Sequence, residues 1–440
     1  MRVAPSACAM AAAAATAFLL LAAPASAQSL APAPSTNGIS AADTTWMIVA
    51  TAFVLMMSIP GLALFYAGMV RKKNVLATMA QTFAATALCS VLWMLIGYTL
   101  TFGGSGPLLG SLGRVMLRGI GMNTASAFAP TIPEALFMMY QMTFAVITVA
   151  LVAGSVADRM RFSAFMWFSA LWLVVVYVPI AHWVWGGGFL GSAGFLDFAG
   201  GTVVHLNAGI AGLVGALVLG ARRGYGTDNF APYDLSLAVI GTGLLWVGWF
   251  GFNGGSALGV GSRAVFAILA THLAASMGAL TWMTLEWWTR GKPSVLGMIS
   301  GAVAGLGTIT PASGFVLPWH GLIIGLIAGV VCFYSCTWLK IVCGYDDALD
   351  VFGVHGIGGA TGTLLVGFFA THAVGNVSGL FEGHPAQVFI QLYGIAVTLA
   401  WSAIATFVLL KAVAAFTALR VDRQSEMEGL DVTQHGEALQ

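Results

Sequence analysis

Charged side chains are scarce in this sequence: Asp, Glu, Lys and Arg together make up 8% of its 440 residues. In soluble globular domains, about a quarter of the residues have charged side chains. Hydrophobic residues make up 59% of this chain instead. The balance excludes a soluble protein and indicates a polytopic membrane protein in a lipid bilayer. The net charge of +1 gives no reason to expect nucleic acid as a partner.

Cysteine is also rare, with five residues in the whole chain. Cys8 lies in the leader described below, and the others lie in or beside apolar segments: Cys89, Cys332, Cys336 and Cys343. No disulfide framework is indicated. Cys332 and Cys336 are one helical turn apart, which leaves a metal pair as an alternative, but small buried hydrophobic residues are the preferred interpretation. We expect no metal site and no cofactor.

The first 27 residues have the features of a secretory signal peptide. Arg2 gives a short basic region, residues 11–23 form an apolar core, and Ala25-Ser26-Ala27 is a small-x-small cleavage site. We expect cleavage after Ala27, and an uncleaved first helix is the alternative. The Ser-, Pro- and Asn-rich residues that follow predict an extracytoplasmic segment over 28–44.

Apolar stretches of about twenty residues or more, long enough to cross a bilayer, recur eleven times after this segment. They predict an all-α fold of eleven transmembrane helices. The expected cores are 46–70, 75–102, 135–156, 162–181, 200–221, 235–259, 265–288, 294–313, 320–342, 351–373 and 387–417.

Basic residues are divided unevenly between alternate loops. One side carries Arg71, Lys72, Lys73, Arg159, Arg161, Arg222, Arg223, Arg290, Lys292, Lys340, Lys411, Arg420 and Arg423. The other side carries Arg114, Arg118 and Arg263. Cytoplasmic loops are the ones enriched in Lys and Arg, so the N-terminus is expected outside and the C-terminus inside.

Two segments share one pattern: an acid lies eight residues before a histidine, and glycines lie four and seven after it. The first segment contains Asp197, His205, Gly209 and Gly212, and the second contains Asp347, His355, Gly359 and Gly362. The histidines fall five spans apart, so their helices run in opposite directions. This predicts an inverted repeat, with halves at about 45–221 and 235–373. Small residues let membrane helices approach closely, so the two imidazoles are expected to meet at mid-membrane.

The repeat leaves an eleventh helix at 387–417 and a charged tail at 418–440. The organisation expected is therefore a signal peptide (1–27), an extracytoplasmic segment (28–44), a transmembrane domain (45–417) and a cytoplasmic tail (418–440).

Five ordered motifs resemble those of the ammonium transporter family (Amt/MEP/Rh), in its bacterial Amt branch. They are residues 180–188 (IAHWVWGGG), 197–205 (DFAGGTVVH), 248–253 (GWFGFN), 310–314 (TPASG) and 346–356 (DDALDVFGVHG). The resemblance covers essentially the whole mature chain. It implies a transporter rather than an enzyme, assembled as a homotrimer in the bacterial inner membrane with one pore per subunit.

The resemblance also assigns roles to individual residues. It implies that ammonium, and in some members methylammonium, is recruited at an outer site by Tyr140, Phe144, Trp185 and Ser256. Phe144 and Phe252 form a gate, and His205 and His355 line the pore. Asp197, Gln141 and Trp249 support these groups. Without the resemblance, an interfacial belt explains most Trp and Tyr residues near span ends.

Physical chemistry leaves several choices open. An ammonium ion is costly to move through an apolar pore, whereas ammonia is not, so a proton is expected to leave at the outer site. Imidazoles can relay that proton or only line the path. A bis-histidine haem protein and an ammonium sensor on the same fold remain as alternatives.

Other polar residues near span ends are given structural interpretations. Asp197 is either a direct ligand for ammonium or an N-cap that supports the outer site, and Asp350 and the pair Asp346-Asp347 are expected at a helix start. Interfacial positions are expected for His182, His272, His320, His372 and His384.

The tail carries charges of both signs and is either a disordered segment or a regulatory one. The resemblance favours a tail that packs under the subunit and helps to bind a PII-type signalling protein. The residues that match are Glu428, Gly429, Leu430, Asp431, His435, Gly436 and Glu437.

Overall fold

The structure is a computed structural model that describes residues 38–439. The signal peptide predicted at 1–27 lies outside the described residues, as does residue 440. Within 38–439 the regular structure is helical, and extended pairing is limited to two isolated bridges, Ala125 with Pro133 and Met160 with Arg420. The prediction of an all-α protein is confirmed for these residues.

The helices up to Leu219, in which η marks a turn wider or tighter than the α-helix, are α2 (Ala41–Met56), η1 (Met57–Leu62), α3 (Ala63–Met69), η2 (Lys72–Asn74), α4 (Val75–Leu92), η3 (Trp93–Gly97), α5 (Tyr98–Phe102), η4 (Val115–Leu117), α6 (Glu134–Val156), α7 (Phe162–Trp172), η5 (Leu173–Tyr177), α8 (Val178–Trp185), α9 (Phe189–Ser192), η6 (Gly201–Leu206) and α10 (Asn207–Leu219).

The remaining helices are α11 (Leu235–Trp249), η7 (Phe250–Gly254), α12 (Ser262–Arg290), α13 (Val295–Ile309), α14 (His320–Tyr334), η8 (Ser335–Leu339), α15 (Lys340–Cys343), η9 (Phe352–Gly356), α16 (Ile357–Phe369), α17 (His372–Gly375), η10 (Leu380–Glu382), α18 (Ala386–Ala414), α19 (Arg423–Glu428) and η11 (Asp431–His435).

Ten continuous helical stretches in residues 38–439 are long and apolar enough to cross a membrane. The span predicted at 294–313 is the exception, since α13 has 15 residues and is shorter than a bilayer usually requires. Added Cβ atoms at Gly301 and Gly305 would lie 2.5 and 2.2 Å from carbonyl oxygens of α12, so α13 packs backbone to backbone against that helix. The chain is thus a multi-pass membrane protein of about ten to eleven spans.

Wide turns interrupt the spans at the positions that matter most here. The π-helical segments η6 and η9 carry His205 and His355, and η7 carries Phe252. Such turns are rare and often mark functional sites, because they re-aim side chains within an otherwise regular helix.

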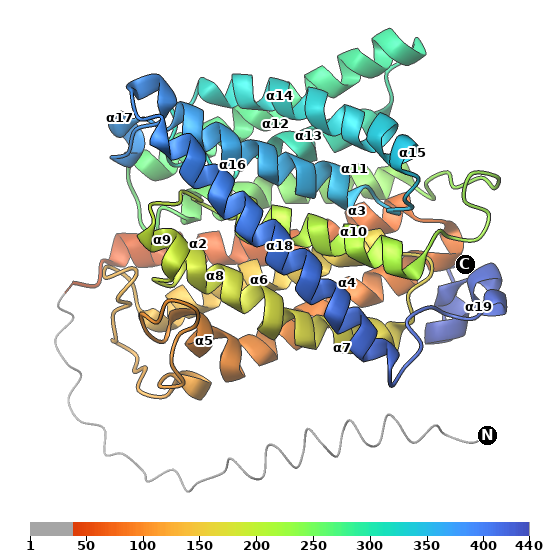
Figure 1. The fold of residues 1–440 in the computed structure, drawn as a ribbon, viewed down its shortest axis with the longest axis horizontal. Coiled ribbons are helices and arrows are strands. Elements are labelled where there is room, and N and C mark those ends of the chain that lie inside the picture. Colours follow the sequence, from red (N-terminus) through yellow and green to blue (C-terminus); the bar gives the residue numbers. More distant parts are fainter. Residues whose placement is uncertain (1–37, 440) are drawn as a thin grey trace, which may run out of the picture. The chain divides into compact units, whose positions relative to one another are not determined.

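The ends of the bundle differ in what covers them. Figure 1 shows α15 and α19 at one end, and α5, α9 and α17 at the other. We call the first end the tail side, because η11 packs there against η2 and α4, and Lys73 of η2 donates to backbone carbonyls of α19. The long helix α18 crosses obliquely over α16, α10 and α7 (Figure 1) and packs against all three.

Candidate functional site

Two buried imidazoles meet near the middle of the bundle. The Nδ1 atoms of His205 and His355 lie 3.2 Å apart, and their rings are nearly parallel with centroids 5.2 Å apart. Both side chains are almost fully buried, at 2% and 4% exposure. The prediction that the repeated pattern brings the two histidines together is confirmed.

Glycines permit this approach. An added Cβ at Gly209 would lie 2.2 Å from the Cα atom of Gly356, and one at Gly359 would lie 2.8 Å from the backbone nitrogen of Leu206. Each glycine four residues after one histidine thus faces the residue directly after the other histidine. The spacing in the sequence therefore produces a reciprocal crossing of the two segments that carry the imidazoles.

The acids of the pattern begin those segments. Asp197 accepts hydrogen bonds from the backbone N–H groups of residues 200–203, at 2.7 to 3.2 Å, and from the hydroxyl of Thr202. Asp347 accepts one from the N–H of Phe352 at 2.7 Å. Of the two interpretations of Asp197, this geometry matches the N-cap, since both carboxylate oxygens are occupied by helix-start donors.

An aromatic cavity of about 280 Å³ lies on the side opposite the tail. Four of the predicted residues line it: Gln141, Phe144, Trp185 and Ser256. Six further residues also line it: Phe102, Phe128, Phe137, Val184, Phe198 and Leu258. We keep the name aromatic cavity for this set.

Two phenylalanines separate the aromatic cavity from the histidines. The rings of Phe144 and Phe252 are stacked, with centroids 4.2 Å apart and planes 24° from parallel. Phe252 is fully buried, and its ring centroid lies 6.1 Å from that of His205. The order from the cavity inward is therefore Phe144, Phe252, His205 and His355.

Tyr140 lies behind the aromatic cavity and does not line it. Its fully buried hydroxyl lies 2.9 Å from the carbonyl oxygen of Phe252 and 3.3 Å from the hydroxyl of Ser256. Ser256 in turn donates to the carbonyl of Phe252 at 2.8 Å. Tyr140 therefore holds the segment that presents Phe252 and Ser256.

Two tryptophans fix the surroundings of these groups. Trp185 meets the ring of Phe144 at 90° and donates from Nε1 to the carbonyl of Asp197 at 2.8 Å. Trp249 stacks on His205 with centroids 5.4 Å apart and donates to the hydroxyl of Thr310. Trp249 thus packs against the pore histidine, and Trp185 joins the cavity wall to the cap of η6.

Four aromatic lining residues were missed by the sequence analysis: Phe102, Phe128, Phe137 and Phe198. Phe102 ends α5, Phe137 lies in the first turn of α6, and the other two lie in loops. Periodicity gives no signal in loops. Of these four residues, only Phe198 lies within one of the five motifs, at 197–205.

The expectation of an interfacial position is wrong for His182 and His320, which are buried. The ring nitrogens of His182 lie 2.6 and 2.5 Å from the carbonyl oxygens of Thr101 and Gly106. His182 therefore ties the loop after α5 to the end of α8, close to Trp185. The other three predicted interfacial histidines are exposed: His272, His372 and His384.

A tail-side cavity of about 530 Å³ reaches His355 from the other end. Its walls carry ion pairs between Lys340 and Asp350 at 2.7 Å, and between Arg290 and Glu286 at 3.2 Å. Asp350 lies at a helix start, as expected, where its carbonyl accepts from the N–H of Val354 at 2.9 Å. Its side chain pairs with Lys340, however, and the side chain of Asp347 provides the cap. Burial raises the pKa of Asp350, and Lys340 opposes that rise.

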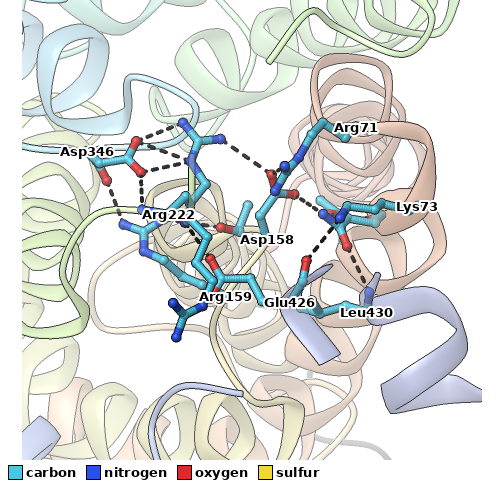
Figure 2. Close-up of polar contacts among 12 residues, drawn as sticks. Arg71, Lys73, Asp158, Arg159, Arg222, Asp346, Glu426 and Leu430 are labelled. Atoms are coloured by element: carbon cyan, nitrogen blue, oxygen red, sulfur yellow. Dashed lines mark hydrogen bonds and ion pairs between the residues drawn. The ribbon is translucent and has the colours of Figure 1, made fainter. Parts of the chain in front are cut away.

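The tail is joined to this end of the bundle by a network of polar contacts (Figure 2). Asp158 accepts from Arg71 at 3.1 Å and from Asn74 at 2.5 Å, and Arg222 lies 3.5 Å from it. Arg222 also pairs with Asp346 at 2.7 Å. Burial acts to raise the pKa of the Asp346 carboxyl. The hydrogen bonds and positive charge of Arg222 have the larger combined effect, so the pKa of Asp346 is lowered.

Tail residues complete the network. Asp431 accepts from the N–H groups of Leu76 and Ala77, at 3.1 and 2.7 Å, and so caps the start of α4. The N–H of Leu430 donates to Asn74 at 2.8 Å. Lys73 donates to the carbonyls of Glu426 and Met427. The tail is therefore packed, and the disordered alternative does not describe residues 418–439.

The other predicted tail residues occupy defined places. Gly429 has φ +115°, and an added Cβ there would lie 2.6 Å from Lys73. The ring of His435 meets that of Phe162 edge-on, 4.9 Å away. Glu428 accepts from Gln424, Gly436 has φ +71°, and the N–H of Glu437 donates to the carbonyl of Asp431.

Fold and site together define a class of protein: a multi-pass membrane protein with a histidine-lined path between two cavities. Comparison of the chain with known proteins leads to the same class. The family model described as Ammonium Transporter Family matches residues 45–439. The chain therefore belongs to the ammonium transporter family, whose members are transporters and not enzymes.

Individual relatives are similar along nearly their whole length. The ammonium transporter of Bacillus subtilis is 49% identical over 397 residues, covering 90% of this chain and 97% of the relative. A putative ammonium transporter of Methanothermobacter thermautotrophicus is 47% identical over 403 residues, covering 91% and 98%. The crystal structure of Candida albicans Mep2 superposes with a TM-score of 0.84 at 36% identity, covering 92% of each chain.

Proposed function

We propose that this protein takes up ammonium by recruiting the ion in the aromatic cavity, removing a proton there and passing ammonia along the twin-histidine path. The observation that carries the proposal is a continuous series of four neighbouring groups: the aromatic cavity, the stacked Phe144–Phe252 pair, the two imidazoles and the tail-side cavity.

The aromatic cavity suits a small cation. Aromatic faces attract a desolvated cation by about 2 kcal/mol or more. Ser256 donates its proton to the carbonyl of Phe252, so its oxygen lone pairs remain as acceptors for the N–H groups of ammonium. Methylammonium carries the same charge and three N–H donors, so it is a second candidate substrate.

The Phe144–Phe252 pair favours ammonia over ammonium. A fully desolvated cation would cost several kcal/mol at this depth, whereas a neutral molecule would not. We therefore propose that the proton leaves before the nitrogen passes the gate. In this scheme His205 and His355 hold ammonia by hydrogen bonds or relay the proton, and net uptake is electrogenic.

The proposed orientation places the tail side in the cytoplasm of a bacterial inner membrane and the aromatic cavity outside. Basic residues gather near the tail side, which supports this assignment. The reciprocal Gly209 and Gly359 contacts support an inverted repeat. A homotrimer and a PII-type partner on the tail side remain proposals that come from the family resemblance.

A bis-histidine haem protein is disfavoured by the same geometry. Two nitrogens that ligate one metal on opposite sides lie about 4 Å apart, with bonds of about 2 Å each. The facing Nδ1 atoms lie 3.2 Å apart. An absorption spectrum of the purified protein is expected to lack a Soret band, and the presence of one would favour haem.

The first prediction tests transport directly. Purified protein in proteoliposomes on a solid-supported membrane is expected to give an ammonium-evoked current. The double variant His205→Ala, His355→Ala is expected to lower that current by at least about tenfold, since both pore imidazoles are removed. The control is Ser276→Ala on α12, because the Ser276 hydroxyl donates only to the backbone carbonyl of His272 within its own helix. A wild-type protein without ammonium-specific current would refute electrogenic uptake.

A further inference from the structure

The two acids of the repeated pattern are not equivalent. Asp197 uses both carboxylate oxygens, each of which accepts at least two hydrogen bonds. Asp347 uses only Oδ2, which accepts from Phe352. Its Oδ1 has no hydrogen-bond partner among residues 38–439, and the residue is fully buried. A buried carboxylate oxygen of this kind costs free energy unless a donor reaches it.

Further polar atoms without partners lie at the end of α6 and in the segment that carries Asp347. Ser155 Oγ, Arg159 Nε and Tyr345 OH are buried and make no hydrogen bond within the described part of the chain. The segments are joined by the Ala348 N–H, which donates to the carbonyl of Ser155 at 3.3 Å, and by Arg159, which donates to the carbonyl of Asp346 at 2.5 Å. Sites with several such atoms commonly hold ordered water.

Lys340 connects Asp347 to the tail-side cavity. Its ammonium donates to the carbonyl of Asp347 at 2.6 Å and to the carboxylate of Asp350 at 2.7 Å. Lys340, Asp350 and His355 all line that cavity. The charged groups around Asp347 are thus Lys340 and Arg159 with positive charge, and Asp346 and Asp350 with negative charge.

We propose that Asp347 is the inner proton-holding residue of the pathway, with Oδ1 as the atom that takes the proton. Ammonium outside gives ammonia and a proton; the proton reaches the Asp347 carboxylate through water and makes a neutral carboxyl. Asp347 is fully buried and does not itself line the tail-side cavity, so the carboxyl then gives its proton through water to ammonia in that cavity, which restores the carboxylate and forms ammonium. Atoms and charge balance, and Asp347 is unchanged after each cycle.

This inference rests on the proposed function, and it explains why the pattern is unequal. Asp197 has no free oxygen and acts as a cap, whereas Asp347 caps η9 with one oxygen and keeps the other available. The substitution Asp347→Asn separates the two tasks. An amide oxygen still accepts from the N–H of Phe352, but an amide cannot hold a proton near neutral pH.

Three measurements on reconstituted wild type, Asp347→Asn and Asp347→Glu test the proposal. They are ammonium-evoked current, ammonia permeation reported by a pH dye inside liposomes, and infrared difference spectra of the carboxyl C=O stretch on ammonium addition. Asp347→Asn is expected to lower the current by at least about tenfold, to keep ammonia permeation within about twofold and to lose one carboxyl band. Asp347→Glu is expected to retain part of the current.

The matched control is Asp234→Asn, which makes the same chemical change at an acid that caps the start of α11 and does not line the tail-side cavity. It is expected to keep the current within about twofold of wild type. An unchanged current in Asp347→Asn would overturn the proposal, and so would an equal loss of current and ammonia permeation, which is the result for a cap alone.

The infrared signal separates this proposal from the proposed function. If wild type carries no ammonium current but shows a carboxyl band that Asp347→Asn lacks, electrogenic uptake fails while proton holding by Asp347 stands. If no band depends on Asp347, the proton-holding role fails whatever the current shows.

Discussion

At the scale of single residues, hydroxyl and amide groups decide how the aromatic cavity presents acceptors. Ser256 donates to the carbonyl of Phe252 and lies 3.3 Å from the hydroxyl of Tyr140. The hydroxyls of Tyr140 and Ser256 therefore share the carbonyl of Phe252 as an acceptor. Because the Ser256 proton points to that carbonyl, the direction of the free lone pairs on Ser256 is fixed. Tyr140 acts one step behind the cavity, through the segment that it holds.

The residue-scale prediction concerns Ser256→Ala. Loss of a hydrogen bond to a charged group costs about 1.5–3 kcal/mol when the bond is fully formed. The ammonium concentration for half-maximal current is therefore expected to rise by at least about tenfold, with a smaller effect on the maximal current. Ser276→Ala on α12 makes the same chemical change outside the cavity and should leave both values alone. Equal values in wild type and Ser256→Ala would exclude the hydroxyl as an acceptor for ammonium.

At the scale of helices, close approach between η6–α10 and η9–α16 depends on glycine. The interhelical contact at Gly209 is made to backbone atoms of Gly356, which cannot move aside as a flexible side chain can. Overpacking of such a contact typically costs about 1–3 kcal/mol. The separation of the two imidazoles is set by this crossing.

The element-scale prediction is that Gly209→Ala separates the histidines and lowers both transport and thermal stability. The matched control is Gly243→Ala on α11, because an added Cβ there meets nothing within 4 Å. Alanine has the higher helix propensity, so this control is expected to be neutral or slightly stabilising. Melting temperature in detergent and ammonium current together check the result. A Gly209→Ala protein that melts and transports as wild type does would contradict the crossing.

At the scale of the whole molecule, the tail is part of the structure beneath the bundle. Asp431 caps α4, and Leu430 reaches Asp158 through Asn74 (Figure 2). Burial raises the pKa of Asp431 above its ordinary value, and the backbone donors of α4 oppose that rise. Its cap joins the last residues of the chain to the second span.

The prediction at this scale is that Asp431→Ala loosens the tail. Loss of an N-cap costs about 1 kcal/mol, so limited proteolysis of residues after 418 should become faster while the bundle survives. Capture of a purified PII-type protein is expected to weaken in this variant and to vanish when residues 421–440 are removed. Glu437→Ala is the control for the proteolysis measurement alone, because its side chain makes no hydrogen bond in the described residues, whereas the resemblance counts it among the residues of the PII-binding tail. PII capture that survives the truncation would exclude a role for the tail.

Much of the path could be predicted because its signals are local. The paired histidines, their acids and their glycines follow from spacing along two helices, and the order of the spans follows from apolar length. Residues brought in by loops could not be predicted. Phe128 and Phe198 reach the cavity through the packing of long connections, which His182 helps to fix. Local patterns gave no signal for the tail either, because its partners Lys73 and Asn74 are far away in sequence, and only the family resemblance indicated that the tail packs under the subunit.

The facing Nδ1 atoms of His205 and His355 have one further consequence. One ring must donate and the other accept, so the pair exists in one of two tautomeric patterns. A proton relayed through both rings leaves the opposite pattern behind, and a second proton in the same direction must wait until the rings reset. Trp249 is stacked on His205, so a flip of that imidazole breaks this contact. In the proposed relay scheme, the pair must return to its first tautomeric pattern before the next proton passes, so the rate of this exchange sets an upper limit on turnover.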